Sequence, residues 1–126
     1  MDYYKHLNED LLMEMAEIGR LDGYKILIYG NEGPIPHFHV EHKEKKIKSC
    51  IKILEDDYFQ HGVHKDTLDN KIVKKLKLFL SEPHKIFSKH GYSNWQIICI
   101  YWNDNNPDYL IKEDLDKLKM PLYNNL

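Results

Sequence analysis

The stretch HFHVEHKEKKIKSCIKIL, residues 37–54, decides the fold that we predict for this chain. Side chains on a β-strand point alternately to its two faces, so a strand with one buried face alternates apolar and polar residues. The first six residues alternate Phe38 and Val40 with histidine and glutamate, and the last eight show a similar alternation built on isoleucine. The polar segment KEKK (43–46) between them is short enough for a turn. We therefore predict two antiparallel strands joined by this turn.

A third strand is predicted before this hairpin. The segment YKILIYG (24–30) is rich in the β-branched and aromatic residues that favour strands. The segment NEGPIP (31–36), which follows it, carries a glycine and two prolines, which interrupt regular structure and favour loops. Because all these connections are short, the three strands are expected to pair as an antiparallel meander.

Amphipathic helices are expected before and after the strands. Residues 6–23 are predicted to form a helix, because Asn8 suits an N-cap and apolar residues recur at helical spacing behind it. A second helix is predicted to begin at Asp69 or Asn70, and a further helical segment is expected over residues 81–91. The apolar face predicted for the second helix consists of Ile72, Val73, Leu76, Phe79 and Leu80.

The remaining segments are less decisive. The segment NWQIICIYW (94–102) has the composition of a strand, but its tryptophans and an isoleucine recur at helical spacing behind Asn94, and both assignments stay open. Residues 55–70 are polar and irregular, which indicates a loop. The polar C-terminal residues 103–126 are expected to lie over the surface.

The length and composition are those of one globular domain. The chain has 126 residues, of which 42% are hydrophobic and 30% are charged. We therefore predict an α+β fold, with a three-stranded antiparallel sheet packed against amphipathic helices in a single domain over residues 1–126. Cys50 and Cys99 are far apart and outside any C-x-x-C motif, so they are expected to be free thiols.

The charge and apolar pattern indicate the surroundings of the protein. The formal net charge is -2, so there is no overall attraction to nucleic acid. The longest apolar run, IICIYW, is far shorter than the roughly 20 residues that span a bilayer, and no secretory signal is evident. We expect a cytoplasmic protein without a membrane partner. The preference for lysine over arginine, with abundant asparagine, isoleucine and tyrosine, is typical of AT-rich coding sequences from bacteria or phages.

The strongest candidate site is the His-x-His pair on the strand 37–42. His37, His39 and Glu41 share one face, opposite Phe38 and Val40, so we expect the histidines on the less apolar side of the sheet, within reach of solvent or a partner. Their Cα atoms lie about 6.6 Å apart, which lets both imidazoles bind one zinc or iron ion. Glu41 lies about 13 Å from His37 along the strand and is not an easy third ligand.

Further ligands for a metal ion must come from other segments. The candidates are His61 and His64 of the HGVH loop, Glu44, Asp56 and Asp57. With Glu44, the strand has the H-x-H-x4-E spacing of the first cupin motif, although the chain lacks a second motif and enough strands for a double-sheet barrel. The alternative is that the pair makes structural hydrogen bonds, and we expect the HGVH loop not to reach it. No cofactor is expected, with zinc or another divalent metal as the alternative.

A catalytic role without metal is also open. In an enzyme, His37 and His39 would be the catalytic residues, serving as general base and general acid in RNA cleavage. A binding surface for phosphates is predicted at the adjoining turn, where basic side chains gather, and the alternative is a solvated hairpin tip. These basic residues are Lys43, Lys45, Lys46 and Lys48.

The segment Ile35-Pro36-His37-Phe38-His39-Val40-Glu41, behind a strand and a turn with Asn31, resembles the N-x-P-P-H-F-H-V-like motif of a small uncharacterised bacterial domain-of-unknown-function family. The resemblance covers about residues 24–102, although isoleucine replaces the first proline of the motif. It implies a strand on each side of the motif and favours a helix over residues 94–102. Members of this family are often encoded beside toxin–antitoxin-type partners, and the resemblance supplies no established catalytic residues.

These observations lead to two expected functions. The first is a small binding protein of bacterial or phage origin, a toxin–antitoxin-like component or phage-encoded inhibitor that acts on a protein partner. The alternative is a small histidine-based or metal-dependent nuclease that uses the strand with His37 and His39, with nucleic acid as its partner.

Overall fold

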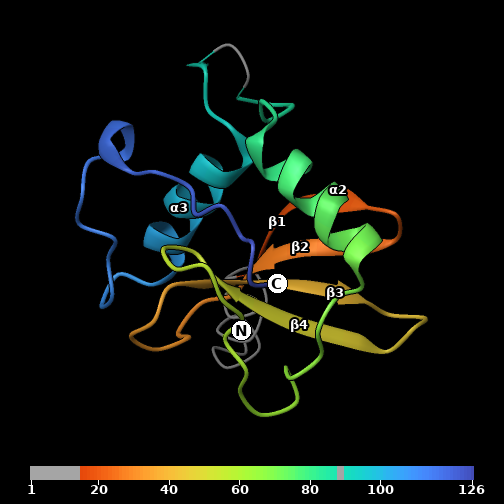
Figure 1. The fold of residues 1–126 in the computed structure, drawn as a ribbon. Helices are drawn as coiled ribbons and strands as arrows, with labels where there is room; N and C mark the ends of the chain where they lie inside the picture. The colour runs from red at the N-terminus through yellow and green to blue at the C-terminus, as the bar shows by residue number, and fades with distance from the viewer. Residues whose placement is uncertain (1–14, 88–89) are drawn as a thin grey trace, which may run out of the picture.

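The computed structural model describes residues 15–87 and 90–126, and in these ranges it forms a four-stranded antiparallel sheet with strand order β1-β2-β3-β4 and two α-helices (Figure 1). The strands are β1 (Ala16–Leu21), β2 (Tyr24–Ile28), β3 (His37–His42) and β4 (Ile47–Lys52), the helices are α2 (Asn70–Ser81) and α3 (Asn94–Asn105), and a short 3-10 helix is η2 (Leu115–Lys117). The predicted α+β class and antiparallel meander are confirmed, but the sheet has four strands rather than three.

The additional strand β1 replaces part of the helix predicted over residues 6–23. Asp22 and Gly23 have φ of 49° and 84°, which fits the two-residue turns that join antiparallel strands. Leu21 therefore pairs with Tyr24, and β1 runs back along β2. The helix prediction, which ended at Gly23, was wrong from Ala16 onward because Gly23 belongs to a turn that joins two strands. The earlier part of that prediction, up to residue 14, lies outside the described residues.

One face of the sheet and both helices enclose the hydrophobic core. Phe38 and Val40 are fully buried and pack with the helices, as the alternation predicts. Helix α2 begins where expected, with the side chain of Asp69 accepting a hydrogen bond from the backbone N–H of Ile72 at 2.9 Å. Figure 1 shows α2 and α3 on the same side of the sheet, which leaves the other face to loops in the part of the chain that is described.

Residues 94–102 are helical, so the ambiguity in the sequence is resolved in favour of α3. Ser93 caps this helix, and Gln96 completes a capping box. Asn94 is the first residue of the helix, and its side-chain amide donates to the carbonyl of Phe79 at 2.7 Å. The further helix expected over residues 81–91 does not form over residues 82–87, which make a bend, a bridge and a turn.

The C-terminal segment contributes to the core, contrary to the expected surface position. Tyr123 is 1% exposed, and its hydroxyl lies 2.8 Å from the carbonyl oxygen of Lys52 and 2.9 Å from that of Ile53. The aromatic ring thus fills the core while the hydroxyl meets backbone acceptors at the end of β4. Within the described ranges, no helix is long and apolar enough to cross a bilayer.

A buried histidine cluster as candidate metal centre

His37 and His39 lie on the sheet face opposite Phe38, as predicted, but both are buried instead of being accessible. Their exposed fractions are 1% and 0%. Aromatic side chains cover them, with ring centroids 4.8 Å apart for His37 and Phe59 and 4.5 Å apart for His39 and Tyr29. The expectation of access to solvent was wrong because alternation along one strand does not reveal which loops cover that face.

Tyr29 follows β2 directly, and the segment after β4 supplies Phe59. The backbone N–H of Phe59 donates to the carbonyl of Cys50 at 2.9 Å, and that of Asp66 donates to the carbonyl of Lys48 at 3.2 Å. The chain therefore leaves the edge of β4 and rejoins it two residues away. Residues 60–65 between these two anchors form an arch that carries the HGVH sequence.

The HGVH sequence forms a tight turn that places two histidines side by side. His61 and His64 exchange backbone hydrogen bonds of 3.2 and 2.8 Å. Gly62 has φ of 54°, the conformation that a type II′ turn requires at its first central position. Because residues paired in this way point to the same side, the two imidazole centroids are 5.1 Å apart.

The HGVH turn reaches the histidines of β3, contrary to expectation. The ring centroids of His37 and His61 are 5.3 Å apart, and those of His39 and His64 are 4.7 Å apart. All four histidines proposed from the sequence as metal ligands are therefore brought together. The length of the arch and its two anchors on β4 produce this contact, and neither is evident from residue spacing.

Cys50 is a member of the cluster that sequence reasoning missed. It is the cross-strand partner of His39, and its Sγ atom lies 3.1 Å from His39 Nδ1. The signal was available, because a turn over residues 43–46 pairs His42 with Ile47 and then necessarily pairs His39 with Cys50. Burial raises the pKa of the Cys50 thiol, while the neighbouring imidazole of His39 opposes this shift.

Glu32 is a second member that was missed. Its Oε1 lies 2.6 Å from His39 Nε2 and 3.6 Å from His37 Nε2. Asn106, which caps α3, holds the loop in place, since it accepts from the N–H of Glu32 at 2.9 Å and donates to the carbonyl of Tyr29 at 3.0 Å. The imidazoles of His37 and His39 hold the pKa of the Glu32 carboxyl well below its usual range.

Glu41 lies at the margin of the cluster. Its Oε2 is 3.5 Å from His39 Nδ1 and 3.7 Å from His64 Nε2, and it accepts a hydrogen bond of 3.2 Å from the hydroxyl of Tyr29. Burial opposes the charged form of His39, but the contacts with Cys50, Glu32 and Glu41 outweigh it and raise the pKa of His39 to about 10. The side chains of Glu41 and His64 are 18% and 22% exposed, which gives the cluster a route to solvent.

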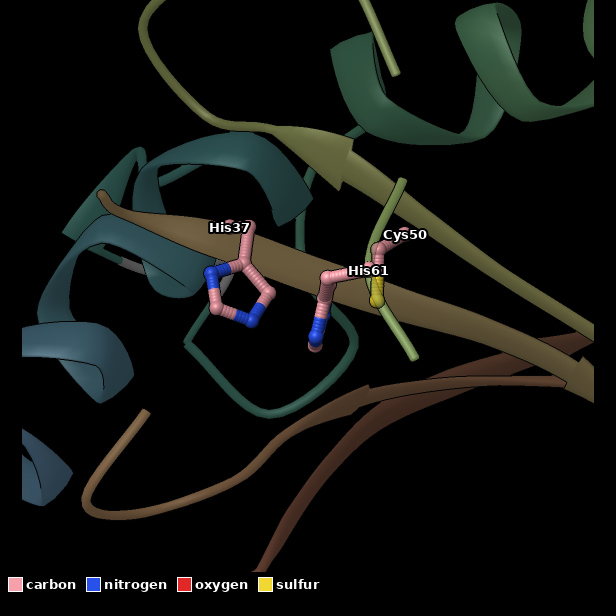
Figure 2. Close-up of side chains that lie close together, drawn as sticks. All are labelled: His37, Cys50 and His61. Atoms are coloured by element: carbon pink, nitrogen blue, oxygen red, sulfur yellow. The ribbon is translucent and has the colours of Figure 1, made fainter. Parts of the chain in front are cut away.

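Two ring nitrogens in the cluster have no partner within hydrogen-bond distance, although Glu32 Oε1 lies 3.6 Å from one of them, His37 Nε2. His37 Nδ1 lies 2.7 Å from the carbonyl oxygen of Ile35, to which it must donate, so Nε2 is the atom with the free lone pair in the neutral ring. Among the described residues, the buried side-chain nitrogens and oxygens without a partner are this Nε2 and that of His61. Figure 2 shows these two imidazoles close together, with Cys50 beside His61.

Potential ligand atoms form three overlapping groups within the described ranges. In each group, one ligand atom from every member lies within 4.8 Å of the others. The groups are His37–Cys50–His61, His39–Cys50–His64 and Glu32–His37–His39. Imidazole, thiolate and carboxylate are the protein ligands that bind zinc and other first-row transition metals. We call the six residues in these groups the histidine cluster.

The other acidic candidates from the sequence lie elsewhere. Glu44 is exposed on the β3–β4 turn, so it does not complete a metal site of the kind that the cupin-like spacing suggested. The carboxylate of Asp56 accepts from the backbone N–H groups of Asn124 and Asn125, each at 2.9 Å, and Asp57 accepts from that of Tyr58 at 2.8 Å. These carboxylates therefore serve local backbone structure. The four lysines predicted as a binding surface are exposed on the turn and at the start of β4.

Comparisons with known proteins do not extend these observations, since no family model, curated protein or solved structure matches the chain. The resemblance of the His-x-His segment to an uncharacterised bacterial family stays a prediction.

Proposed function

We propose that this protein binds a divalent transition-metal ion through His37, His61 and Cys50, and that this ion is zinc. The observation that carries this proposal is the pair of buried Nε2 atoms of His37 and His61 that have no hydrogen-bond partner. Both residues share one group of potential ligands with the Sγ atom of Cys50. A metal ion would give a partner to both nitrogens at once.

Binding of an ion to the Nε2 atoms of His37 and His61 would be energetically favourable. A buried polar group without a partner costs about 1–3 kcal/mol, and folded proteins contain few of them. His37 is oriented as metal-binding histidines commonly are, since its other ring nitrogen donates to a backbone carbonyl, that of Ile35. The site is thus arranged at the expense of stability, which is typical of functional positions.

The proposed ligand set fits zinc chemistry. Two imidazoles and one thiolate supply three ligands of a tetrahedral zinc ion, whose fourth position takes water or another group. Neighbouring ligand atoms of such an ion are about 3.3–3.7 Å apart, from the usual zinc bond lengths. One ligand atom from each of the three residues lies within 4.8 Å of the other two, so these atoms would need to move together by no more than about 1.5 Å to bind one ion. His39 and Glu32, which belong to overlapping groups with Cys50 and His37, are the candidates for the fourth position.

This proposal favours the metal-dependent form of the expected nuclease. A zinc ion with a water in its fourth position lowers the pKa of that water and can supply a nucleophile. The metal-free form is less supported, because the imidazole of His39 is engaged with Glu32 and Cys50. A binding protein of the toxin–antitoxin or phage-inhibitor type stays a proposal from the sequence.

Metal content tests the proposal directly. The protein is purified without chelator, dialysed against buffer with micromolar zinc, and analysed for bound metal by mass spectrometry. We expect one zinc per chain in the wild type, and its loss in H61A and H37A variants that retain the wild-type circular dichroism spectrum. His90 is exposed and outside the cluster, so H90A is the matched control and keeps the ion. Wild-type levels of zinc in H61A and H37A would refute the ligand assignment.

A further inference from the structure

A cavity of about 590 Å³ lies on the same sheet face as the histidine cluster. The β1–β2 turn bounds it at Gly23, and the β3–β4 turn bounds it at Lys43 and Lys46. The remaining lining residues are Met15, Lys25, Leu27, Tyr29, Glu41, His42, Ile47 and Lys48. The volume falls in the usual range of sites for a single small molecule, which is about 300–1,000 Å³.

The strand register places this cavity next to the cluster. Lys25, Glu41 and Lys48 pair across β2, β3 and β4 and form one row of side chains. The next row on this face, which pairs Leu27, His39 and Cys50 in the same way, contains two members of the cluster. Successive rows on one face are about 7 Å apart, from the strand rise. The cavity and the histidine cluster are therefore neighbours, and Glu41, which lines the cavity, contacts His39 and His64 of the cluster.

The charges around the cavity are unbalanced. Four lysines and one carboxylate, that of Glu41, line it, which gives a formal excess of three positive charges. The ion pairs found among residues 15–87 and 90–126 do not include Lys25, Lys43, Lys46 or Lys48. Glu41 itself is turned toward the Tyr29 hydroxyl and the histidines. The lysines are thus available to a negatively charged ligand.

The cavity also has an apolar part. Leu27 and the ring of Tyr29 line it on this face and offer a surface suited to an apolar or aromatic group. A site lined by lysines alone would suit any anion, and an apolar site would suit neutral molecules. The combination favours a ligand that carries both a negative charge and an apolar or aromatic group.

We propose that this cavity binds a small organic phosphate, a phosphate ester of an aromatic or apolar group about the size of a mononucleotide. Lysine is a common phosphate ligand. A phosphate dianion would balance more of the excess positive charge in the cavity than a ligand with a single carboxylate would. Residues of the two hairpin turns line one end of the cavity, and its volume is that of a site for a single small molecule. This binding does not require a metal ion in the cluster, and its proximity to Glu41 places the ligand beside that cluster.

The experiment uses adenosine 5′-monophosphate as the probe, measured by isothermal titration calorimetry at about 50 mM salt in the presence of a chelator. Adenosine and inorganic phosphate test the two halves of the ligand separately. We expect the monophosphate to bind at least tenfold more tightly than either half. The variant K25Q/K48Q should weaken this binding at least tenfold, because it removes both lysines that flank Glu41 in its row. The variant K74Q/K119Q, which removes two exposed lysines elsewhere, should leave the affinity unchanged.

The proposal would be overturned by no measurable binding of the monophosphate, by equal binding of adenosine or of inorganic phosphate, or by equal affinity in wild type and K25Q/K48Q. A single-stranded RNA oligonucleotide that binds more than tenfold more tightly than the monophosphate would contradict a site for one small molecule. Because the titrations are made without metal, their failure leaves the zinc proposal standing, and failure of zinc binding leaves these titrations valid.

Discussion

Replacing His61 with phenylalanine should make the metal-free protein more stable and the zinc-loaded protein less stable than the wild type. The ring of His61 stacks on Phe59, with centroids 4.6 Å apart and planes inclined by 27°. A phenyl ring keeps this stacking and removes the Nε2 atom that lacks a partner. At the low end of the cost of such an atom, H61F should gain about 1 kcal/mol in the free energy of unfolding without metal.

Zinc should reverse this order. A free zinc concentration of about 100 times the dissociation constant stabilises the wild type by about 2.7 kcal/mol. H61F has lost a ligand, so the wild type should then be more stable by about 1.7 kcal/mol, the difference between these two contributions. If zinc reverses the order of stability of H61F and the wild type, H61F acts through loss of a metal ligand. A change in packing alone would shift the stability in the same direction with and without zinc.

Urea unfolding followed by tryptophan fluorescence measures both states, since Trp95 and Trp102 are buried in the core. With a slope near 2 kcal/mol/M, a change of 1 kcal/mol moves the midpoint by about 0.5 M. The measurements are made in EDTA and in zinc, with a reducing agent, and H90A serves as the control that follows the wild type. The reasoning fails if H61F unfolds at lower urea than the wild type in EDTA, or if zinc leaves the wild-type midpoint unchanged.

Three further predictions concern the scaffold and are measured by the same urea unfolding. Y123F should cost about 1 kcal/mol through loss of the hydrogen bond to the carbonyl of Ile53, and an unchanged midpoint would place the C-terminal segment outside the core. S93A should also cost about 1 kcal/mol, because it removes the cap of α3 and one half of the capping box with Gln96, whereas a neutral effect would contradict this helix start. Gly62→Ala should cost about 1 kcal/mol and weaken zinc binding, because φ is 54° at this position. No atom lies close to an added Cβ, so the whole cost comes from the backbone conformation. Equal stability of Gly62→Ala and the wild type would contradict this turn.

Periodicity predicted the parts of the fold that depend on one segment at a time. The alternation around Phe38 and Val40 identified β3, and helical spacing with an aspartate cap identified α2. The N-terminal strand was missed because the Asp22-Gly23 pair ends helices and also joins strands, and local sequence does not distinguish the two uses. The C-terminal segment was misplaced because one buried aromatic residue, Tyr123, is enough to attach a polar segment to the core.

The candidate site was predicted only in part, for a related reason. The two histidines of β3 and the two of the HGVH turn were all identified as candidate ligands, but whether they meet depends on backbone hydrogen bonds that anchor the arch to β4. Cys50 follows from the hairpin register once the turn is fixed. Glu32 does not follow from any local pattern, because its position depends on Asn106, 74 residues away in the chain.

X-ray absorption spectroscopy of the zinc-loaded protein tests the central claim most directly, since it reports the atoms bound to the ion. Ligation by His37, His61 and Cys50 predicts a shell of nitrogen or oxygen atoms at about 2.0–2.1 Å, with imidazole features and one sulfur at about 2.3 Å. The sulfur should disappear in C50A. A zinc spectrum with oxygen and nitrogen ligands alone in the wild type would contradict the proposed site.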